Sequence, residues 1–146
     1  MNAAFVYPFW LVIGYYKGLR GQITMEWYLE VLKKYAVFAG RARRKEYWFY
    51  TLFNVIISLV LATVDKMIVS PNGEFGMGLL SIVYSLGTLI PSLAVAVRRL
   101  HDTDHSAWWL LIVLVPIIGP LVLLYFFVQE GNPSQNEYGS NPKLLI

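Results

Sequence analysis

Three long stretches without a charged side chain dominate this sequence and limit what it can fold into. They are residues 47–64 (YWFYTLFNVIISLVLATV), 77–97 (MGLLSIVYSLGTLIPSLAVAV) and 107–128 (AWWLLIVLVPIIGPLVLLYFFV). At a rise of about 1.5 Å per residue, helices of these lengths can cross a hydrocarbon core of roughly 30 Å, the first only just. A lipid-exposed backbone must satisfy its own hydrogen bonds, which favours helices. We therefore predict an all-α integral membrane protein with three transmembrane helices.

The overall composition agrees with a membrane protein and excludes several kinds of site. The chain is 57% hydrophobic and 14% charged, whereas about a quarter of the residues of a soluble domain are charged. It contains no cysteine, which excludes disulfides, thiolate metal ligands and cysteine nucleophiles. The net charge is +3, but in a membrane protein the positions of the basic residues matter more than their sum. We predict no nucleic-acid partner and no cofactor.

The segment before the first stretch has the pattern of an amphipathic helix over residues 25–39. Its apolar face carries Tyr28, Val31, Leu32, Tyr35, Phe38 and Ala39, and the opposite face carries Glu26, Glu30, Lys33 and Lys34. Such a helix just ahead of a transmembrane span is typical of one that lies in the membrane interface. The alternative is an ordinary packing face against a partner.

The two ends of the chain frame a single membrane domain, which we expect over residues 25–143. The apolar run within residues 1–24 is too short to span a bilayer and is interrupted by Pro8 and Gly14. It is either an extra interfacial segment or an extension upstream of a true initiator at Met25. Residues 129–146 are rich in Gly, Asn, Pro and Ser, which predicts an irregular C-terminal tail.

The distribution of basic residues predicts the orientation. Of the 12 Lys and Arg residues, ten lie before the first span or in the loop 98–106, and only Lys66 and Lys143 lie on the other side of a three-span arrangement. Basic loops stay in the cytoplasm, so we expect the N-terminus and the 98–106 loop inside and the C-terminus in the periplasm. A bend at PIIGP (116–120) would instead make the third segment re-entrant and return the tail to the cytoplasm.

Two motifs meet at the predicted cytoplasmic surface, GRARRKEYW (40–48) and RRLHDTDHSAWW (98–109). In each, basic residues adjoin aromatic rings at the edge of a span. Tyr47 and Trp48 begin the first span and Trp109 the third, where amphipathic rings favour the headgroup layer. Arg98 and Arg99 close the second span at its partially negative end. Membrane anchoring therefore explains most of these residues.

The remaining candidates for chemistry are Glu46, His101, Asp102, Asp104 and His105. A metal site would need a third strong donor, and these two histidines are the only ones. Acid–base catalysis by His101 with Asp102 has a suitable pKa range but no nucleophile or substrate pocket.

We favour structural ion pairs for the carboxylates. Asp102 would pair with Arg98 or with the cluster at 41–44, and Glu46 with Arg99, near the low-dielectric boundary. Asp104 or Ser106 would then cap the third helix.

Three segments together resemble the YhaH-like bacterial inner-membrane proteins, the domain of unknown function 805. They are YLEVLKKYAVFAGRARRKEYWFYTLFN, RRLHDTDHSAWW and GNPSQNEYGSNP, and the resemblance covers about residues 25–143. It implies a small multipass protein of the bacterial inner membrane, with no established activity to carry over. Relatives often have a basic residue such as arginine where this chain has His105, which weakens a two-histidine metal site. The family motif corresponds here to Gly40, Arg41, Arg44, Glu46, Tyr47, Trp48, Arg98, Arg99, His101, Asp102, Ser106 and Trp109.

We predict a non-enzymatic function. The arginine-rich cytoplasmic face would bind anionic lipid headgroups, or a membrane or cytoplasmic protein partner, and the chain could form a homo-oligomer. The first alternative is a component of an oligomeric small transporter or channel, although the spans contain no charged residue at mid-membrane. The second is an enzyme that acts on lipid headgroups through His101 and Asp102.

Overall fold

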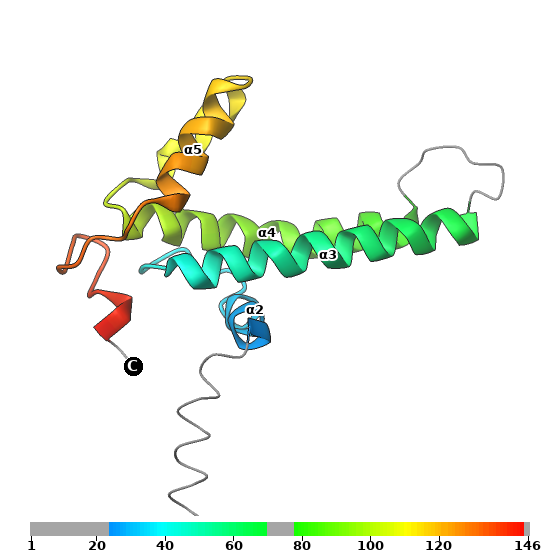
Figure 1. The fold of residues 1–146 in the computed structure, drawn as a ribbon, viewed down its shortest axis with the longest axis horizontal. Helices are drawn as coiled ribbons and strands as arrows, with labels where there is room; N and C mark the ends of the chain where they lie inside the picture. Colours follow the sequence, from blue (N-terminus) through cyan, green and yellow to red (C-terminus); the bar gives the residue numbers. More distant parts are fainter. Residues whose placement is uncertain (1–23, 70–77, 145–146) are drawn as a thin grey trace, which may run out of the picture.

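The computed structural model describes residues 24–69 and 78–144, and its elements are helices (Figure 1). Apart from Thr24, the N-terminal extension predicted over residues 1–24 lies outside the described residues. In chain order the elements are α2 (Thr24–Lys33), α3 (Arg44–Val69), α4 (Leu79–Asp102), the 3-10 helix η1 (Ala107–Leu114), α5 (Ile118–Val128) and the short 3-10 helix η2 (Pro142–Leu144). The prediction of an all-helical fold is confirmed for the residues that the structure describes.

Helices α3 and α4 lie side by side along the long axis of the molecule (Figure 1). Two described helices, Arg44–Ile68 and Leu79–Asp102, are long and apolar enough to cross a membrane. Helix α3 extends beyond both ends of the predicted stretch 47–64, and α4 begins two residues later than the predicted stretch 77–97 and ends five residues later. Glu46 in the first turn of α3 and Arg99 and His101 in the last turn of α4 complement the helix dipoles, so residues expected to form the start of the 98–106 loop continue α4.

At the far end of this pair, Asp65 of α3 caps the start of α4. The N-cap position of α4 is Gly78, which has no side chain to accept a hydrogen bond. The Asp65 carboxylate instead accepts from the amides of Leu80 (3.2 Å) and Ser81 (2.8 Å) and from the Ser81 hydroxyl (2.6 Å). Gly78 is required because a β-carbon there would lie 2.2 Å from Asp65 Cγ. A carboxylate on one helix thus supplies the N-terminal acceptor that the next helix lacks.

Proline 91 lies inside α4 without ending it. Proline has no amide hydrogen, so the carbonyl four residues earlier, that of Gly87, loses its helical donor. The Tyr35 hydroxyl donates to this carbonyl at 2.7 Å. A neighbouring segment therefore satisfies the backbone group that Pro91 frees, as is usual for proline in apolar helices.

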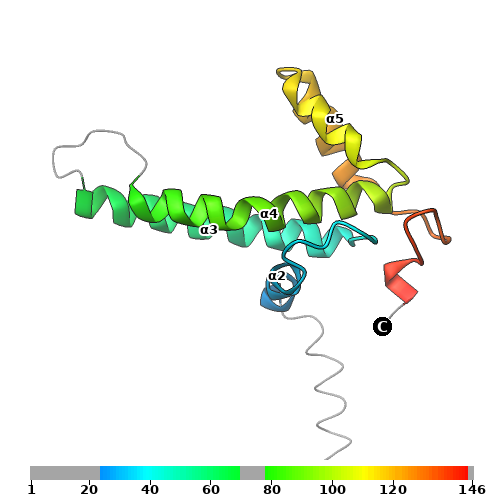
Figure 2. The same ribbon diagram turned by 180° about the vertical axis from the view of Figure 1, so that it is seen from behind.

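Helix α2 lies across α3 and α4, and Figures 1 and 2 both look along its axis. Tyr28 and Val31 are buried and Leu32 packs beside them, so the first half of the predicted apolar face contacts the helix pair. The Tyr28 ring stacks on that of Tyr50 with centroids 5.5 Å apart. The helix is shorter than the predicted 25–39, because the chain turns after Lys33 and leaves Phe38 exposed.

The third apolar stretch, predicted as one span over 107–128, is a hairpin of η1 and α5. Pro116 lacks an amide donor and Ile117 has a φ of 68°, so helical hydrogen bonding stops there. The two arms then approach so closely that a β-carbon on Gly119 would lie 1.8 Å from the Ile112 carbonyl oxygen. The prediction of a single helix over 107–128 is therefore wrong, and the bend at 116–120 is present.

The hairpin returns the tail to the end of the molecule that carries the 98–106 loop (Figure 1). The Asn132 amide donates to the Asp102 carbonyl at 2.8 Å, and Arg41 Nη1 donates to the Ser134 carbonyl at 2.7 Å. The tail therefore contacts the end of α4, whereas the predicted three-span arrangement places it on the opposite side of the membrane. The tail itself makes a tight turn at 136–139 and ends in η2.

Candidate functional site

Five charged residues form a buried group, here called the arginine cluster, where α3, α4, α5 and the tail meet. Its members are Arg41, Glu46, Arg98, Arg99 and Asp102, each less than 9% exposed. Buried charges are costly unless they are paired and hydrogen-bonded. The partners of each member therefore decide what the cluster can do.

Asp102, the last residue of α4, is shared by two arginines. Arg41 Nε donates to its Oδ1 at 3.0 Å, and Arg99 Nη1 donates to its Oδ2 at 2.5 Å. The predicted pairing of Asp102 with the 41–44 segment is present, at Arg41. Two guanidinium groups thus share one carboxylate, so Arg41, Arg99 and Asp102 together carry a net positive charge.

Arg99 also binds the end of the hairpin. Its Nε donates to the carbonyl of Phe127 at 3.2 Å, and its Nη2 donates to the carbonyls of Phe126 and Gln129. The last carbonyls of an α-helix have no intrahelical donor, so Arg99 of α4 acts as the C-terminal cap of α5. One fully buried guanidinium thus ties the hairpin to the end of α4.

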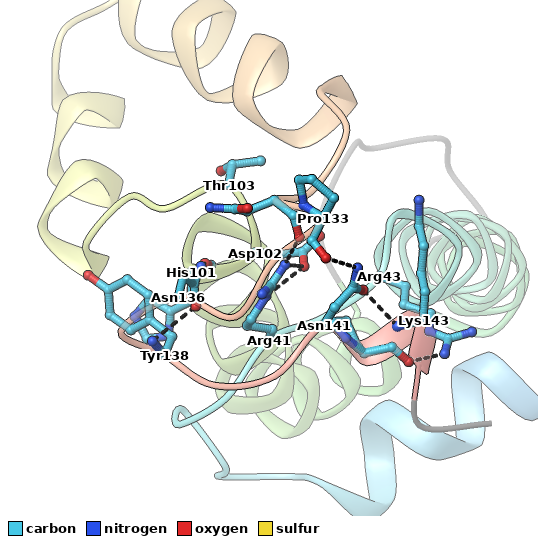
Figure 3. A network of polar contacts seen from close by, with 12 residues as sticks. Arg41, Arg43, His101, Asp102, Thr103, Pro133, Asn136, Tyr138, Asn141 and Lys143 are labelled. Carbon is cyan, nitrogen blue, oxygen red and sulfur yellow. Dashed lines mark hydrogen bonds and ion pairs between the residues drawn. The ribbon is translucent and has the colours of Figure 1, made fainter.

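Arg41 holds the tail in the same way (Figure 3). Beyond Asp102, its guanidinium donates to the carbonyls of Ser134 (2.7 Å), Gly139 (3.3 Å) and Asn132. Arg43 beside it donates to the Pro142 carbonyl. The arginine-rich segment predicted to face the cytoplasm therefore uses much of its hydrogen-bonding capacity on the chain's own tail.

Arg98 forms the second buried ion pair. Its Nη1 donates to Glu46 Oε1 at 2.6 Å, so Glu46 pairs with Arg98 and not with Arg99 as predicted. Arg98 and Arg99 lie about 100° apart around the helix, and the two side chains therefore reach different partners. Within the described residues, Nε and Nη2 of Arg98 have no hydrogen-bond partner.

His101 and Asp102 do not form an acid–base pair. His101 Nδ1 lies 3.1 Å from the carbonyl oxygen of Gly40, whose φ of 87° suits glycine. The imidazole stacks on the Tyr138 ring with centroids 3.8 Å apart and planes 6° from parallel (Figure 3). The Asp102 oxygens are meanwhile held by Arg41 and Arg99. The imidazole therefore joins the 40–48 segment to the tail.

The other predicted site residues surround the end of the hairpin. Arg44 pairs with Glu130 and donates to the Val128 carbonyl at 3.2 Å. Trp48 Nε1 donates to the Phe127 carbonyl at 3.3 Å, and the Tyr47 ring packs on that of Phe127. These contacts join the start of α3 to the end of α5.

The remaining two lie at the start of η1. Ser106 occupies its N-cap position without a side-chain hydrogen bond. Trp109 packs edge-on against Phe126, and His105 contacts both rings. His105 Nδ1 lies 3.2 Å from the Thr103 hydroxyl, so the two histidines have separate partners.

Sequence reasoning missed the tail as part of the site. Asn136 Nδ2 donates to the His101 carbonyl at 2.8 Å, and Asn141 Nδ2 donates to the Pro133 carbonyl at 2.9 Å (Figure 3). The asparagines and glycines of 131–141 suggested only irregular structure, although side-chain amides often fix turns. Their density was the one available signal that the tail has a defined shape.

Comparison with known proteins identifies the family of this chain. Residues 35–140 match the family described as protein of unknown function (DUF805). The chain is 49% identical over 120 residues to "Inner membrane protein YhaH" of Escherichia coli (strain K12), which covers 82% of this chain and 98% of that relative. It is 50% identical over 119 residues to "Inner membrane protein YhaI" of the same strain, which covers 82% and 97%.

No solved structure matches the chain. The family match includes every member of the arginine cluster, both membrane-length helices, the hairpin and most of the tail. With half of the aligned residues identical to two inner-membrane proteins over nearly their whole lengths, this chain belongs to the DUF805 family.

Proposed function

We propose that this protein is a non-enzymatic component of the bacterial inner membrane that binds anionic lipid headgroups at the end carrying the arginine cluster. The main observation behind this proposal is that basic side chains outnumber carboxylates in two ion-paired groups at this end of the molecule. Asp102 is shared by Arg41 and Arg99, and Glu130 is shared by Arg44 and Lys143. Each group keeps a net positive charge at one end of two membrane-length helices, the level at which phosphate headgroups lie.

The proposal includes a topology. Helices α3 and α4 span the membrane, α2 lies in the cytoplasmic interface, and the η1–α5 hairpin enters the membrane from the cytoplasm and returns. The N-terminus, the 98–106 loop and the tail then share the cytoplasmic side, which agrees with the excess of basic residues there. The hairpin's apolar side chains support this arrangement, since Trp108, Leu114 and Ile117 are each more than three-quarters exposed and need an apolar environment.

The alternatives have less support. An enzyme using His101 and Asp102 would need these side chains free. The Asp102 carboxylate is held by Arg41 and Arg99, and the His101 ring stacks on Tyr138 of the tail. Within residues 24–69 and 78–144, the buried charged side chains lie near the two ends of the α3–α4 pair. An ion-coupled transporter usually carries such groups at mid-membrane.

The topology is tested with reporters fused to the C-terminus. We expect a fluorescent protein that matures only in the cytoplasm to be bright, and alkaline phosphatase, active only in the periplasm, to be silent. The reverse result would reject the cytoplasmic tail and restore a third full span.

Headgroup binding is tested by native mass spectrometry of the full chain from membranes with equal phosphatidylglycerol and phosphatidylcholine. We expect several-fold enrichment of phosphatidylglycerol, reduced by salt. Replacing exposed Lys45 by Gln should weaken the preference by about fivefold, since a basic residue near an anionic surface contributes ~1 kcal/mol. Lys66→Gln, the same change at the opposite end of α3, is the control. Equal retention of both lipids, or a second copy or other protein retained in place of anionic lipid, would contradict the proposal.

A further inference from the structure

A cavity of about 250 Å³ lies beside the arginine cluster. Its walls come from the turn after α2, the glycine of the 40–48 segment, the end of α4 and the tail turn. Three basic side chains line it, those of Lys34, Arg41 and Arg98, and the described lining includes no acidic residue. A concave site with cations and no carboxylate favours an anionic ligand.

Arg98 lines this cavity, and part of its guanidinium has no hydrogen-bond partner within the described residues. Its side chain is 2% exposed, and Glu46 occupies only Nη1. Nε and Nη2 form the opposite edge of the planar guanidinium, with two parallel N–H groups, and neither has an acceptor within the described residues. A buried donor without a partner carries a free-energy cost. Nε and Nη2 of Arg98 therefore form a two-donor edge, or fork, without an acceptor.

The chemistry of a fork selects the ligand. Guanidinium binds carboxylate and phosphate through two parallel N–H···O bonds, whereas an ammonium acts as a point charge. A single water can occupy such an edge but brings no negative charge. A phosphate group brings two suitably spaced oxygens and negative charge to the same place.

The walls leave space for such a group. Gly40 and Gly139 both line the cavity with positive φ, and a β-carbon at either position would meet no atom within 4 Å. Lys34 is ion-paired with Glu30 at 2.9 Å and Arg41 with Asp102, so both contribute mainly electrostatic potential. The exposed apolar side chain of Val37 lines the cavity and offers a contact for an acyl chain.

We infer that this cavity is a phosphate-binding site in which Nε and Nη2 of Arg98 hold two phosphate oxygens. The inference rests on the proposed function for one point only, that the phosphate is carried by a lipid headgroup. A soluble phosphate would use the same donors, so the two sources are separated by experiment.

The test uses the full chain purified in dodecyl maltoside, a detergent without phosphate. Calorimetry measures binding of inorganic phosphate, and native mass spectrometry in nanodiscs measures preference for phosphatidylglycerol over a neutral glycolipid that lacks phosphate. Arg98→Lys keeps the charge beside Glu46 but removes the fork, and we expect it to weaken both kinds of binding at least about tenfold.

A second variant keeps the test valid if Arg98→Lys fails to fold. Ser140 is exposed and lines the cavity, so Ser140→Asp places a carboxylate there without touching the Arg98–Glu46 pair. We expect it to weaken phosphate binding about fivefold by like-charge repulsion. Gln135→Asp adds the same charge to an exposed tail residue outside the cavity, and we expect a change of less than about twofold.

The outcomes separate the two proposals. Loss of lipid preference in Arg98→Lys and Ser140→Asp, with Gln135→Asp unchanged, supports both. Inorganic phosphate binding that these variants abolish, with no lipid preference, supports the cavity site and rejects the headgroup function. A lipid preference that neither variant changes, with no binding of inorganic phosphate, supports headgroup binding and overturns the cavity site. Absence of both kinds of binding overturns both proposals.

Discussion

The two ends of the α3–α4 pair are built by different means. At the end that carries the arginine cluster, the 40–48 segment, α4, the hairpin and the tail meet through buried ion pairs and guanidinium–carbonyl hydrogen bonds. At the far end, Asp65 joins α3 to the start of α4. Apolar side chains in this half of the α3–α4 pair, here called the far half, face outward. Leu59 is 64% exposed and Leu86 is 65% exposed.

This difference shows which part of the molecule is fixed by contacts within the chain. Directional interactions between segments far apart in sequence fix the cluster end. The outward apolar side chains of the far half gain little from the chain itself and depend on lipid for burial. Substitutions at the two ends should therefore affect different properties, namely thermal stability and tail order at the cluster end and membrane insertion in the far half.

Asp102→Asn should have the largest effect. The amide keeps the shape of the side chain but leaves Arg41 and Arg99, both at most 1% exposed, without their counter-charge. Removing one partner of a buried ion pair costs about 3–5 kcal/mol. We expect a large drop in the thermal unfolding temperature in detergent and early proteolysis of the tail. Asp104→Asn, the same change two residues later at an exposed position, is the control and should be nearly neutral.

Leu59→Asp tests the far half and should rank second. Leu59 makes few contacts within the chain, so its replacement would cost little if this surface faced water. In a transmembrane helix, an aspartate near the centre costs about 2.5–3.5 kcal/mol of insertion free energy. We expect a reduced membrane-inserted fraction, measured by carbonate extraction. Leu144→Asp changes a leucine of the tail that is 75% exposed, and equal loss for the two variants would contradict a lipid-facing far half.

Ser81→Ala should have a moderate effect confined to the far end. It removes the hydroxyl that donates to Asp65 at 2.6 Å while the amides of Leu80 and Ser81 still donate. A hydrogen bond to a charged acceptor contributes about 1.5–3 kcal/mol. We expect faster amide exchange in the first turns of α4 with the tail unaffected. Ser85→Ala, at an exposed position in the same helix, should leave exchange unchanged.

The sequence predicts the elements that depend on local pattern. Long uncharged stretches identify α3 and α4 because hydropathy is a property of neighbouring residues. The pairing of Asp102 with the 41–44 segment also follows, because unlike charges at one membrane surface attract. The choice between Arg98 and Arg99 as the partner of Glu46 does not follow, since it depends on the rotation of α4 about its axis.

The hairpin and the tail could not be predicted in this way. An apolar run gives the same hydropathy whether it forms one helix or two, and only Pro116, Gly119 and Pro120 indicated a bend. The tail is held by its backbone carbonyls at Asn132, Ser134 and Gly139. Every residue has a carbonyl, so such contacts leave no mark in the choice of side chains. These hydrogen bonds can be identified only in the folded structure, where Arg41 lies beside the three carbonyls.

Lys143→Gln should have the smallest effect, and it compares an exposed ion pair with the buried ion pairs at the same end of the molecule. Lys143 Nζ lies 3.3 Å from Glu130 Oε2, with side chains 53% and 64% exposed. Exposed ion pairs contribute less than about 1 kcal/mol, and salt screens them. We expect a small loss of thermal stability at low salt that disappears at high salt. The loss in Asp102→Asn should persist at high salt, because buried charges are screened far less. If Lys143→Gln released the tail as readily as Asp102→Asn, the exposed pair would hold the tail, and the cluster would not be what separates the two ends.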